Sequence, residues 1–316
     1  MRQNIKNQLC VIVNASKHHW DSNETMITTH PQSAAVPPIA VVIPALHGEI
    51  TALRRSIERQ TWQPCEIEVA VGVRPNGAAR NVATARTTAP YLVFIDDDAV
   101  LGNADAIQHL VEPLLADDTI GVTGAAKLLP PDASRFQRWV AREVPRIEHA
   151  VVSQPLETNP DPPSFYCEIT TTCCAMRRSV YDQVGGFDNE LVRGVDTEFF
   201  LRVRRAGYRF ILVPHTWTWH PAPANLVALL RKHWWYGVGH AQEVQRDPTR
   251  ARGRNLTSRW RAALYLALRT AILPANVFLP YSFAAPSWRP GFKPLKALTS
   301  YVGALGYTWE SVRRRK

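Results

Sequence analysis

Cysteine is scarce in this sequence, and no CxxC pair occurs. The five cysteines are odd in number, and only Cys173 and Cys174 lie close together. A chain of 316 residues can bury a full core without covalent staples, so a disulfide-built scaffold is excluded. The spacing also gives no zinc or redox motif. We therefore expect reduced, buried thiols of the kind found in a cytosolic domain.

A long apolar run is missing near the start of the sequence. The run from Leu9 to Val13 is too short for a secretory signal, and charged and amide residues flank it. We expect residues 1–36 to form a loosely ordered leader. Internal repeats are also missing, and ordinary values of 46% hydrophobic and 20% charged residues exclude wholesale disorder and coiled coil.

Acidic residues are few in the last third of the chain. Residues 201–316 contain 20 Lys or Arg but only 3 Asp or Glu, whereas the first 200 residues contain 17 basic and 24 acidic side chains. Basic residues are therefore in excess in the last third of the chain, and acidic residues are in excess in the first two thirds. Nucleic acid, an anionic membrane face and a phosphorylated substrate all fit such an excess of positive charge, and charge alone does not choose among them.

Short apolar, β-branched runs alternate with helical patterns. Strands are predicted at residues 39–43, 67–71, 91–95, 120–122 and 210–213, and a further buried strand is expected around Cys173 and Cys174. A helix is expected from about Asn225 to Tyr236. This alternation predicts an α/β fold with a mostly parallel sheet and helices on both faces, and with ligands at the carboxyl ends of the strands.

Three adjacent carboxylates, Asp96, Asp97 and Asp98, follow the strand predicted at residues 91–95. They repel one another unless a cation lies among them, and a hard divalent ion is the natural candidate. In an extended backbone Asp96 and Asp98 point to the same side and Asp97 to the other. The alternative is a solvated acidic turn that caps a helix.

Five motifs follow one another along the chain: VVIPALHGE (Val41 to Glu49), NGAARN (Asn76 to Asn81), YLVFIDDDA (Tyr91 to Ala99), GGFDNEL (Gly185 to Leu191) and VDTEFFLRVRRAGY (Val195 to Tyr208). Their order resembles glycosyltransferase family 2, the inverting nucleotide-sugar glycosyltransferases with the Rossmann-like GT-A fold. The resemblance covers about residues 39 to 240. It implies a GT-A domain at residues 37–240, followed by a basic and apolar helical extension at 241–316.

The resemblance also implies roles for particular residues. Asp96 and Asp98 match the family's DxD motif, in which the first carboxylate faces the ribose and the last holds manganese or magnesium on the donor diphosphate. Arg80 matches an arginine near the nucleotide, and its alternative role is a surface salt bridge. Asp196 matches the catalytic base, although Val195 replaces the preceding acid, and its alternative role is a helix N-cap. His220 matches a histidine that relatives sometimes supply to the metal, and its alternative role is structural.

Recognition of the donor base is expected from Glu49 and the backbone around Pro44. The family usually has one or two aspartates after the second strand, whereas this chain has Val71, Gly72, Val73 and Arg74 there. Glu49 has the alternative reading of a solvated residue at a helix start.

The segment from Thr270 to Trp288 contains no charged residue, but Pro274, Pro280 and Pro286 interrupt it. Arginines flank it on both sides. Three interpretations remain open: a segment lying on an anionic inner leaflet, a true membrane span, and a soluble helical subdomain.

Together these features predict a metal-dependent inverting glycosyltransferase. It would move a sugar from a nucleotide-sugar donor to a glycan or lipid-linked acceptor for the cell envelope or a polysaccharide. We expect the protein in the cytoplasm, bound peripherally to the inner face of the cell membrane. We expect no nucleic acid among its partners. A sugar nucleotidyltransferase is the alternative enzyme, but it needs a glycine-rich loop after the first strand, where only Gly48 occurs. A non-enzymatic basic module that binds membrane or nucleic acid explains the charge but not the acidic motif.

Overall fold

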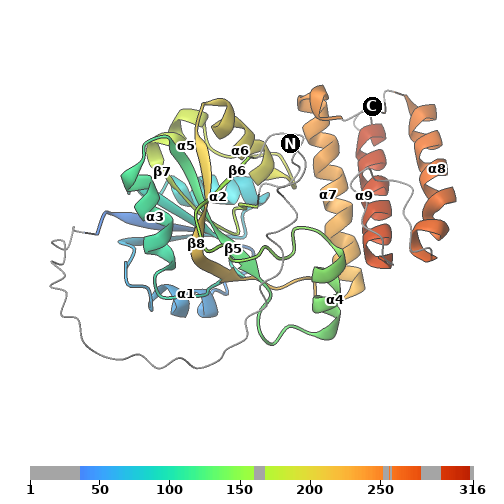
Figure 1. Ribbon diagram of the computed structural model, residues 1–316. Coiled ribbons are helices and arrows are strands. Elements are labelled where there is room, and N and C mark those ends of the chain that lie inside the picture. Colours follow the sequence, from blue (N-terminus) through green and yellow to red (C-terminus); the bar gives the residue numbers. More distant parts are fainter. Residues whose placement is uncertain (1–35, 160–167, 252–255, 257, 279–292, 314–316) are drawn as a thin grey trace, which may run out of the picture. The chain divides into compact units, whose positions relative to one another are not determined.

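The structure is a computed structural model that describes residues 36–159, 168–251, 256, 258–278 and 293–313 (Figure 1). The predicted leader therefore lies outside the described residues, as do Cys10 and Cys167. Within the described part, eight strands form one sheet, in the order β2-β1-β3-β7-β5-β8-β4, with β6 paired to β8. The strands are β1 (Ile39–Ala45), β2 (Glu66–Val71), β3 (Tyr91–Ile95), β4 (Val100–Leu101), β5 (Ile120–Leu128), β6 (Leu156–Thr158), β7 (Cys173–Arg177) and β8 (Arg209–Trp219).

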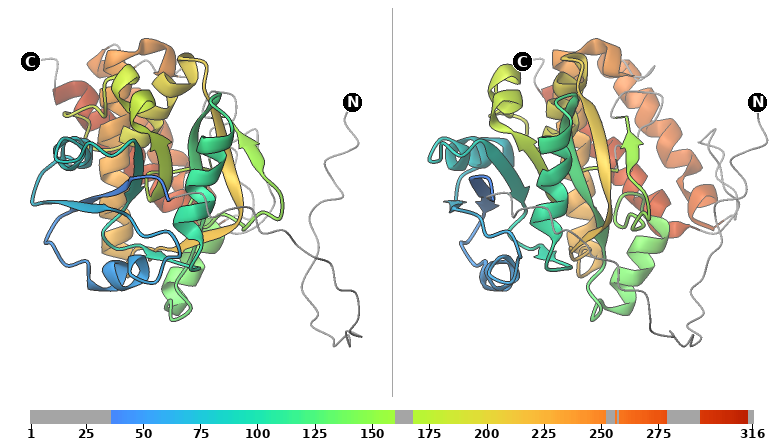
Figure 2. Two further views of the ribbon diagram at one scale, coloured as in Figure 1. Left: turned by 90° about the vertical axis from the view of Figure 1, so that its left-hand side faces the viewer. Right: turned by 60° about the vertical axis from the view of Figure 1, so that its left-hand side comes forward.

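Most of the sheet runs in one direction. β1 is parallel to β2 and β3, and β5 is parallel to β8. β7 lies between β3 and β5 and is antiparallel to both. The strands β1, β2, β3, β5 and β8 therefore run in the same direction. The short strands β4 and β6 pair antiparallel with β8, and Figure 2 shows β6 beside the long β8. The predicted α/β class with a mostly parallel sheet is confirmed. The insertion of β7 is a feature that the sequence pattern did not predict.

Helices cover both faces of this sheet. One apolar cluster joins the strands to α1 (Thr51–Ile57) and α3 (Ala106–Ala116). The other joins them to α2 (Asn76–Thr84), α5 (Arg178–Val184) and α6 (Val195–Arg205). Alternate residues of β1 belong to the two clusters, because successive side chains of a strand point to opposite faces. A strand buried on both faces reads as a continuous apolar run, which is why β1 was recognisable in the sequence.

The cysteines have two kinds of environment. Cys173 and Cys174 are fully buried in β7, where burial raises the pKa of the Cys173 thiol to about 12, so both are packing groups, as predicted. Cys65 is exposed, so the expectation of buried thiols is wrong for this residue. It lies in the turn before β2, where its Sγ contacts the Ile39 carbonyl at 3.3 Å.

Three long helices follow the sheet. They are α7 (Leu226–Arg246), α8 (Arg259–Phe278) and α9 (Pro294–Arg313), and α9 packs between the other two (Figure 1). A shorter helix, α4 (Arg135–Glu143), contacts α9 through its last residue, because the Glu143 carboxylate accepts the Leu295 backbone N–H at 2.8 Å. The domain boundary expected at residue 240 falls inside α7, which is one continuous helix. This boundary stays a prediction. Among the described residues we find no helix with the length and apolar character needed for a membrane span.

Candidate active site

The carboxyl end of β3 meets the start of β7, and this meeting fixes Asp96. Antiparallel pairing places Ile95 opposite Cys173, so the next residue along β3 lies beside Thr172. The Asp96 N–H donates to the Thr172 carbonyl at 3.1 Å, and the Thr172 hydroxyl donates to Asp96 Oδ2 at the same distance. Asp96 is thus held by backbone and side chain together.

Arg80 reaches Asp96 from α2. Its Nη2 lies 2.6 Å from Asp96 Oδ1, and the arginine side chain is only 4% exposed. Arg80 does form a salt bridge, as in the alternative interpretation, but its own side chain is buried and that of Asp96 is partly exposed (21%). Its guanidinium also lies over the ring of Phe187, and its buried Nε has no hydrogen-bond partner. Arg80 orients the first carboxylate of the acidic motif.

The pairing of β4 with β8 brings Asp98 and His220 together. Val100 lies opposite Trp219, so the residues just before β4 face the residue just after β8. His220 Nε2 lies 3.3 Å from Asp98 Oδ1. Burial acts to raise the pKa of Asp98, but the hydrogen bond and charge of His220, together with Lys232, outweigh it, so this pKa lies below its usual value.

Asp97 has a different partner from Asp96 and Asp98, but the reason is not the predicted extended backbone. β3 ends at Ile95, and Asp97 and Asp98 lie in a turn closed by the Ala99 N–H on the Asp96 carbonyl at 3.1 Å. Asp97 Oδ2 accepts the Leu46 backbone N–H at 3.1 Å, which ties the acidic motif to the loop after β1. Burial raises the pKa of Asp97, and the charges of Asp98 and Asp96 add to this effect. Asp97 therefore binds the backbone of the loop after β1, and Asp96 and Asp98 are the carboxylates available to a ligand.

The side chains of Asp96, Asp98 and His220 together fit a divalent cation. One ligand atom from each of Asp96, Asp98 and His220 lies within 4.8 Å of the others. Two carboxylates and an imidazole form a donor set suited to manganese and, through the oxygens, to magnesium. The sequence placed Asp96 and Asp98 together, and the sheet adds His220 from more than a hundred residues away.

Asp196 lies in the first turn of α6. The residue at the cap position is Gly194, in a left-handed conformation with φ of 79°, so Asp196 does not have the N-cap role that was its alternative. Asp196 Oδ1 accepts the Thr197 N–H at 2.9 Å, and its Oδ2 lies 4.0 Å from Arg146. Its side chain is about a quarter exposed (24%), so it keeps access to solvent or a substrate.

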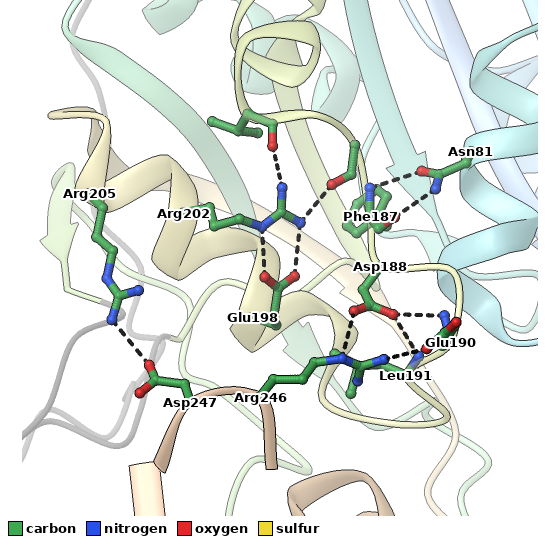
Figure 3. Close-up of polar contacts among 12 residues, drawn as sticks. Asn81, Phe187, Asp188, Glu190, Leu191, Glu198, Arg202, Arg205, Arg246 and Asp247 are labelled. Carbon is green, nitrogen blue, oxygen red and sulfur yellow. Dashed lines mark hydrogen bonds and ion pairs between the residues drawn. The ribbon is translucent and has the colours of Figure 1, made fainter. Parts of the chain in front are cut away.

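The GGFD motif links α6 to α2 and α7 (Figure 3). The side-chain amide of Asn81 donates to the Phe187 carbonyl at 2.7 Å and accepts its N–H at 2.9 Å. Arg202, from within α6, binds the carbonyls of Val184 and Gly186. Arg246, at the end of α7, lies 3.3 Å from the Asp188 carboxylate. This motif is thus a structural clamp between three helices.

The donor-base residues proposed from the sequence lie around the end of β1. Pro44 is buried within β1 and pairs with Ala70 of β2. Glu49 is exposed, and its Oε1 accepts the Thr51 N–H at 3.0 Å. The hydrogen bond with the Thr51 side chain, and then this backbone hydrogen bond, lower the pKa of Glu49. This is the geometry of the helix-start alternative, and the donor role of both residues stays a prediction.

The structure adds a group that sequence motifs missed. Lys127, near the end of β5, is 9% exposed and interacts electrostatically with both Asp96 and Asp196. Arg146 and Lys232 are its cationic neighbours. The available signal was a lysine at the end of an otherwise apolar strand, IGVTGAAKL, since lysine is rarely buried without a function or a partner.

The sheet order, the covering helices and the acidic cluster at the strand ends define an α/β protein of the GT-A type. The family model "Glycosyltransferase like family 2" matches residues 32–237. Since this match covers more than half of the chain, the chain belongs to glycosyltransferase family 2.

Two known proteins show the range of similarity. The chain is 25% identical over 181 residues to the O-antigen chain rhamnosyltransferase RfbN of Salmonella typhimurium (strain LT2), a match that covers 54% of this chain and 55% of the relative. The chain thus matches about half the length of this curated relative. The mannosyltransferase PcManGT of Pyrobaculum calidifontis, solved with GDP-Man and Mn2+, has the same fold, with a TM-score of 0.51 and 17% identity over 91% of this chain and 92% of the other.

Proposed function

We propose that this protein is a metal-dependent inverting glycosyltransferase. It would transfer a sugar from a nucleotide-sugar donor to a hydroxyl group of a glycan or lipid-linked acceptor in cell-envelope or polysaccharide synthesis. The observation that carries the proposal is the cluster of Asp96, Asp98 and His220 at the strand ends, with the accessible carboxylate of Asp196 on a neighbouring helix. The named activity of RfbN and the ligands named for PcManGT support the same class of donor and acceptor.

Each residue has a role in this proposal. Asp98 and His220, with Asp96, would hold manganese or magnesium, which supplies positive charge to the leaving diphosphate. Arg80 keeps Asp96 in place, and Pro44 and Glu49 lie where the donor base is expected. Asp196 accepts the proton of the acceptor hydroxyl as its oxygen attacks the anomeric carbon. Attack from the face opposite the diphosphate inverts the anomeric configuration.

A donor screen tests the reaction class. The protein is incubated with Mn2+, with UDP-, GDP- or dTDP-linked sugars and with membrane glycolipids, and release of nucleoside diphosphate is measured. We expect release with one nucleotide class, and its loss with EDTA. Release of pyrophosphate from a nucleoside triphosphate and a sugar 1-phosphate would instead identify a nucleotidyltransferase. Salt-sensitive binding to DNA in a gel assay without any transfer would favour the non-enzymatic module.

We also propose that the helical extension, taken as residues 241–316, lies on the anionic inner face of the cell membrane. Trp260, Leu264 and Leu268 are 63%, 50% and 57% exposed and recur every fourth residue along α8, which gives one apolar face. Arg259 and Arg261 are exposed at the same end of the helix. An apolar helix face with flanking arginines is typical of a segment at a lipid headgroup boundary.

A further inference from the structure

A groove of about 520 Å³ lies among the helices α7, α8 and α9. Its volume is in the range of roughly 300–1,000 Å³ that small-molecule sites have. α9 packs between the other two helices, and residues of all three line the groove (Figure 1). Most of its wall is apolar, with Leu266 of α8 and Leu305 of α9 as examples. None of its lining residues belongs to the candidate active site, so the groove is a separate feature of the molecule.

The helices α8 and α9 run in opposite directions along the groove. The side-chain hydroxyls of Thr270 and Tyr301 are 2.9 Å apart. Closer to the start of α8, Ala262 packs in one apolar cluster with Tyr307, which lies further along α9. A position nearer the start of α8 thus meets a position nearer the end of α9. The first residue of α8 and the last residue of α9 therefore lie at the same end of the groove.

These two end residues are arginines, and both line the groove. Arg259 begins α8, Arg313 ends α9, and both side chains are exposed. The Arg313 guanidinium lies 4.5 Å from the centre of the Trp309 ring and 3.2 Å from the buried carboxylate of Glu310. Of the described residues that line the groove, none carries a carboxylate. A guanidinium can bind a phosphate through two parallel hydrogen bonds, so this end of the groove suits an anion.

A buried hydroxyl in the wall of the groove has no partner. Thr308 is 5% exposed, and its Oγ1 forms no hydrogen bond with any residue that the structure describes. In the same helix, Thr299 and Ser311 donate to the carbonyls of Leu295 and Tyr307, one turn earlier. A buried hydroxyl without a hydrogen bond costs free energy. The Thr308 hydroxyl therefore indicates an acceptor that a bound molecule supplies.

The polarity of the groove changes along its length. Thr308 precedes Arg313 by about 7 Å along the axis of α9, and Leu305 comes about one turn earlier still. On α8, Leu266 follows Arg259 by about two turns. Charged groups, a hydroxyl and an apolar wall thus follow one another. A phospholipid has its phosphate, its ester carbonyls and its acyl chains in the same order.

We propose that this groove binds one molecule of an anionic phospholipid. The phosphate contacts the guanidinium groups of Arg259 and Arg313, and an ester carbonyl accepts the hydrogen of the Thr308 hydroxyl. One acyl chain lies against Leu266 and Leu305. A free phosphate ion would pair with the arginines but leave the apolar wall in contact with water, so the lipid is the favoured source of the phosphate.

This inference goes beyond the proposed sugar transfer and does not depend on it. It also differs from the proposed contact of α8 with a membrane, because Trp260, Leu264 and Leu268 do not line the groove. A bilayer surface would touch the exposed face of α8, whereas the groove would hold a single lipid even where no bilayer is present.

A short-chain lipid in solution tests the groove without a membrane. Dioctanoyl phosphatidylglycerol, kept below its critical micelle concentration, is titrated into the full chain, and binding is measured by calorimetry. We expect one lipid for each protein chain. Dioctanoyl phosphatidylcholine, whose choline cation cancels the charge of the phosphate, should bind more weakly by about fivefold or more. Glycerol 3-phosphate, which has no acyl chain, should show no measurable binding at the same concentrations.

Matched variants test the assigned contacts. Arg259→Gln and Arg313→Gln should each weaken binding of the phosphatidylglycerol by about tenfold or more, since each removes a charged hydrogen bond. Arg231→Gln, at an exposed position of α7 outside the groove, removes the same charge and should bind normally. Leu305→Trp should fill the groove and abolish binding. Leu115→Trp, at an exposed position of α3, is its control and should bind normally.

Several outcomes would overturn the inference. They are an unchanged protein that binds no phosphatidylglycerol, equal affinity for the two lipids, and equal affinity of Arg259→Gln and Arg231→Gln. Binding of glycerol 3-phosphate as tight as that of the lipid would show a site for phosphate alone. A dimer that forms without lipid and is lost in Leu305→Trp would assign the groove to a second copy of the chain.

The test also separates this inference from the proposed function. If Leu305→Trp does not fold, Arg259→Gln decides the matter by itself, because Arg259 is exposed. Release of nucleoside diphosphate in the donor screen is measured independently of lipid binding. A protein that transfers sugar but binds no lipid keeps the proposed function and loses this inference, and the reverse result does the opposite.

Discussion

The three consecutive aspartates have three different environments, although the sequence presents them as equals. Asp96 is held by Arg80 and Thr172, and Asp97 accepts a backbone N–H. Asp98 is 53% exposed, and His220 is the one side chain within the described residues with which it forms an ion pair. The carboxylate with the fewest protein partners is the one most available to an external cation. Asp98 is therefore the residue at which metal binding is best tested.

Asp98→Asn should remove metal binding without unfolding the protein. The substitution keeps the shape of the side chain but loses the charge, so we expect Mn2+ affinity, measured by calorimetry or electron paramagnetic resonance, to fall by at least roughly tenfold. Asp97→Asn is the matched control, because an amide oxygen still accepts the Leu46 N–H, and it should bind Mn2+ almost normally. Equal Mn2+ affinities in the two variants would refute the metal assignment.

Asp196→Asn should separate binding from chemistry. If Asp196 is the general base, the variant keeps its nucleotide affinity but loses turnover by about a hundredfold or more, which is the typical contribution of a positioned base. NMR of the product of the unchanged protein should show the anomeric configuration opposite to that of the donor. A retained configuration, or undiminished turnover in the variant, would mean that Asp196 is not the base.

At the scale of elements, the start of α6 depends on a close approach by α7. Gly194 has a positive φ, and a Cβ at this position would collide with the Glu243 carboxylate of α7. Asp196 follows two residues later, so its carboxylate is placed by this contact together with the GGFD clamp. The backbone conformation favours glycine here, and an added Cβ would displace the carboxylate end of Glu243, which is buried and paired with His240 and Arg250.

Gly194→Ala should lower both stability and turnover. Gly207→Ala is the control, since Gly207 also has a positive φ, of 95°, but nothing lies near its missing Cβ. We expect urea unfolding to show a loss of about 1 to 2 kcal/mol from the backbone in both variants, with a larger loss for Gly194→Ala because of the collision. Only Gly194→Ala should reduce turnover. Normal turnover in this variant would show that the contact with Glu243 does not position Asp196.

On the scale of the whole chain, acidic chemistry and basic surface belong to different regions. The metal-type cluster lies at the strand ends, whereas the last 116 residues carry a net charge of +17 and the first 200 residues a net charge of −7. The apolar face of α8 lies in this basic region, next to a groove of about 520 Å³ lined by residues that include Trp234, Trp309 and Arg313. Apolar area and positive charge together are the requirements for binding an anionic lipid surface.

Leu264→Glu with Leu268→Glu should release the protein from anionic vesicles. Each leucine is worth roughly 1.5–3 kcal/mol when fully buried, and the added carboxylates repel an anionic surface, so the bound fraction in co-sedimentation should fall by more than tenfold. Leu115→Glu, at an exposed position of α3, is the control and should leave binding unchanged. Equal sedimentation of the double variant and the unchanged protein would refute the proposed membrane face.

Local pattern alone determined the fold class and the strand from Tyr91 to Ile95 with its acidic end. This was possible because burial of a strand on both faces demands a continuous apolar run. The separation of Asp96 and Asp98 from Asp97 was also predicted, but the structure produces it through a turn after β3 and not through an extended chain. The order of the five motifs identified the family. These features depend on neighbouring residues, and a single sequence records them directly.

The tertiary structure decided which distant residues meet the acidic motif. The antiparallel entry of β7 supplies Thr172, and the pairing of β4 with β8 supplies His220. Lys127, at the end of β5, belongs to none of the motifs, and its electrostatic interactions include Asp96 and Asp196. Strand order and pairing direction depend on packing of the whole sheet rather than on local periodicity. The sequence thus determined what chemistry one strand end could offer, and the fold determined which charges surround it.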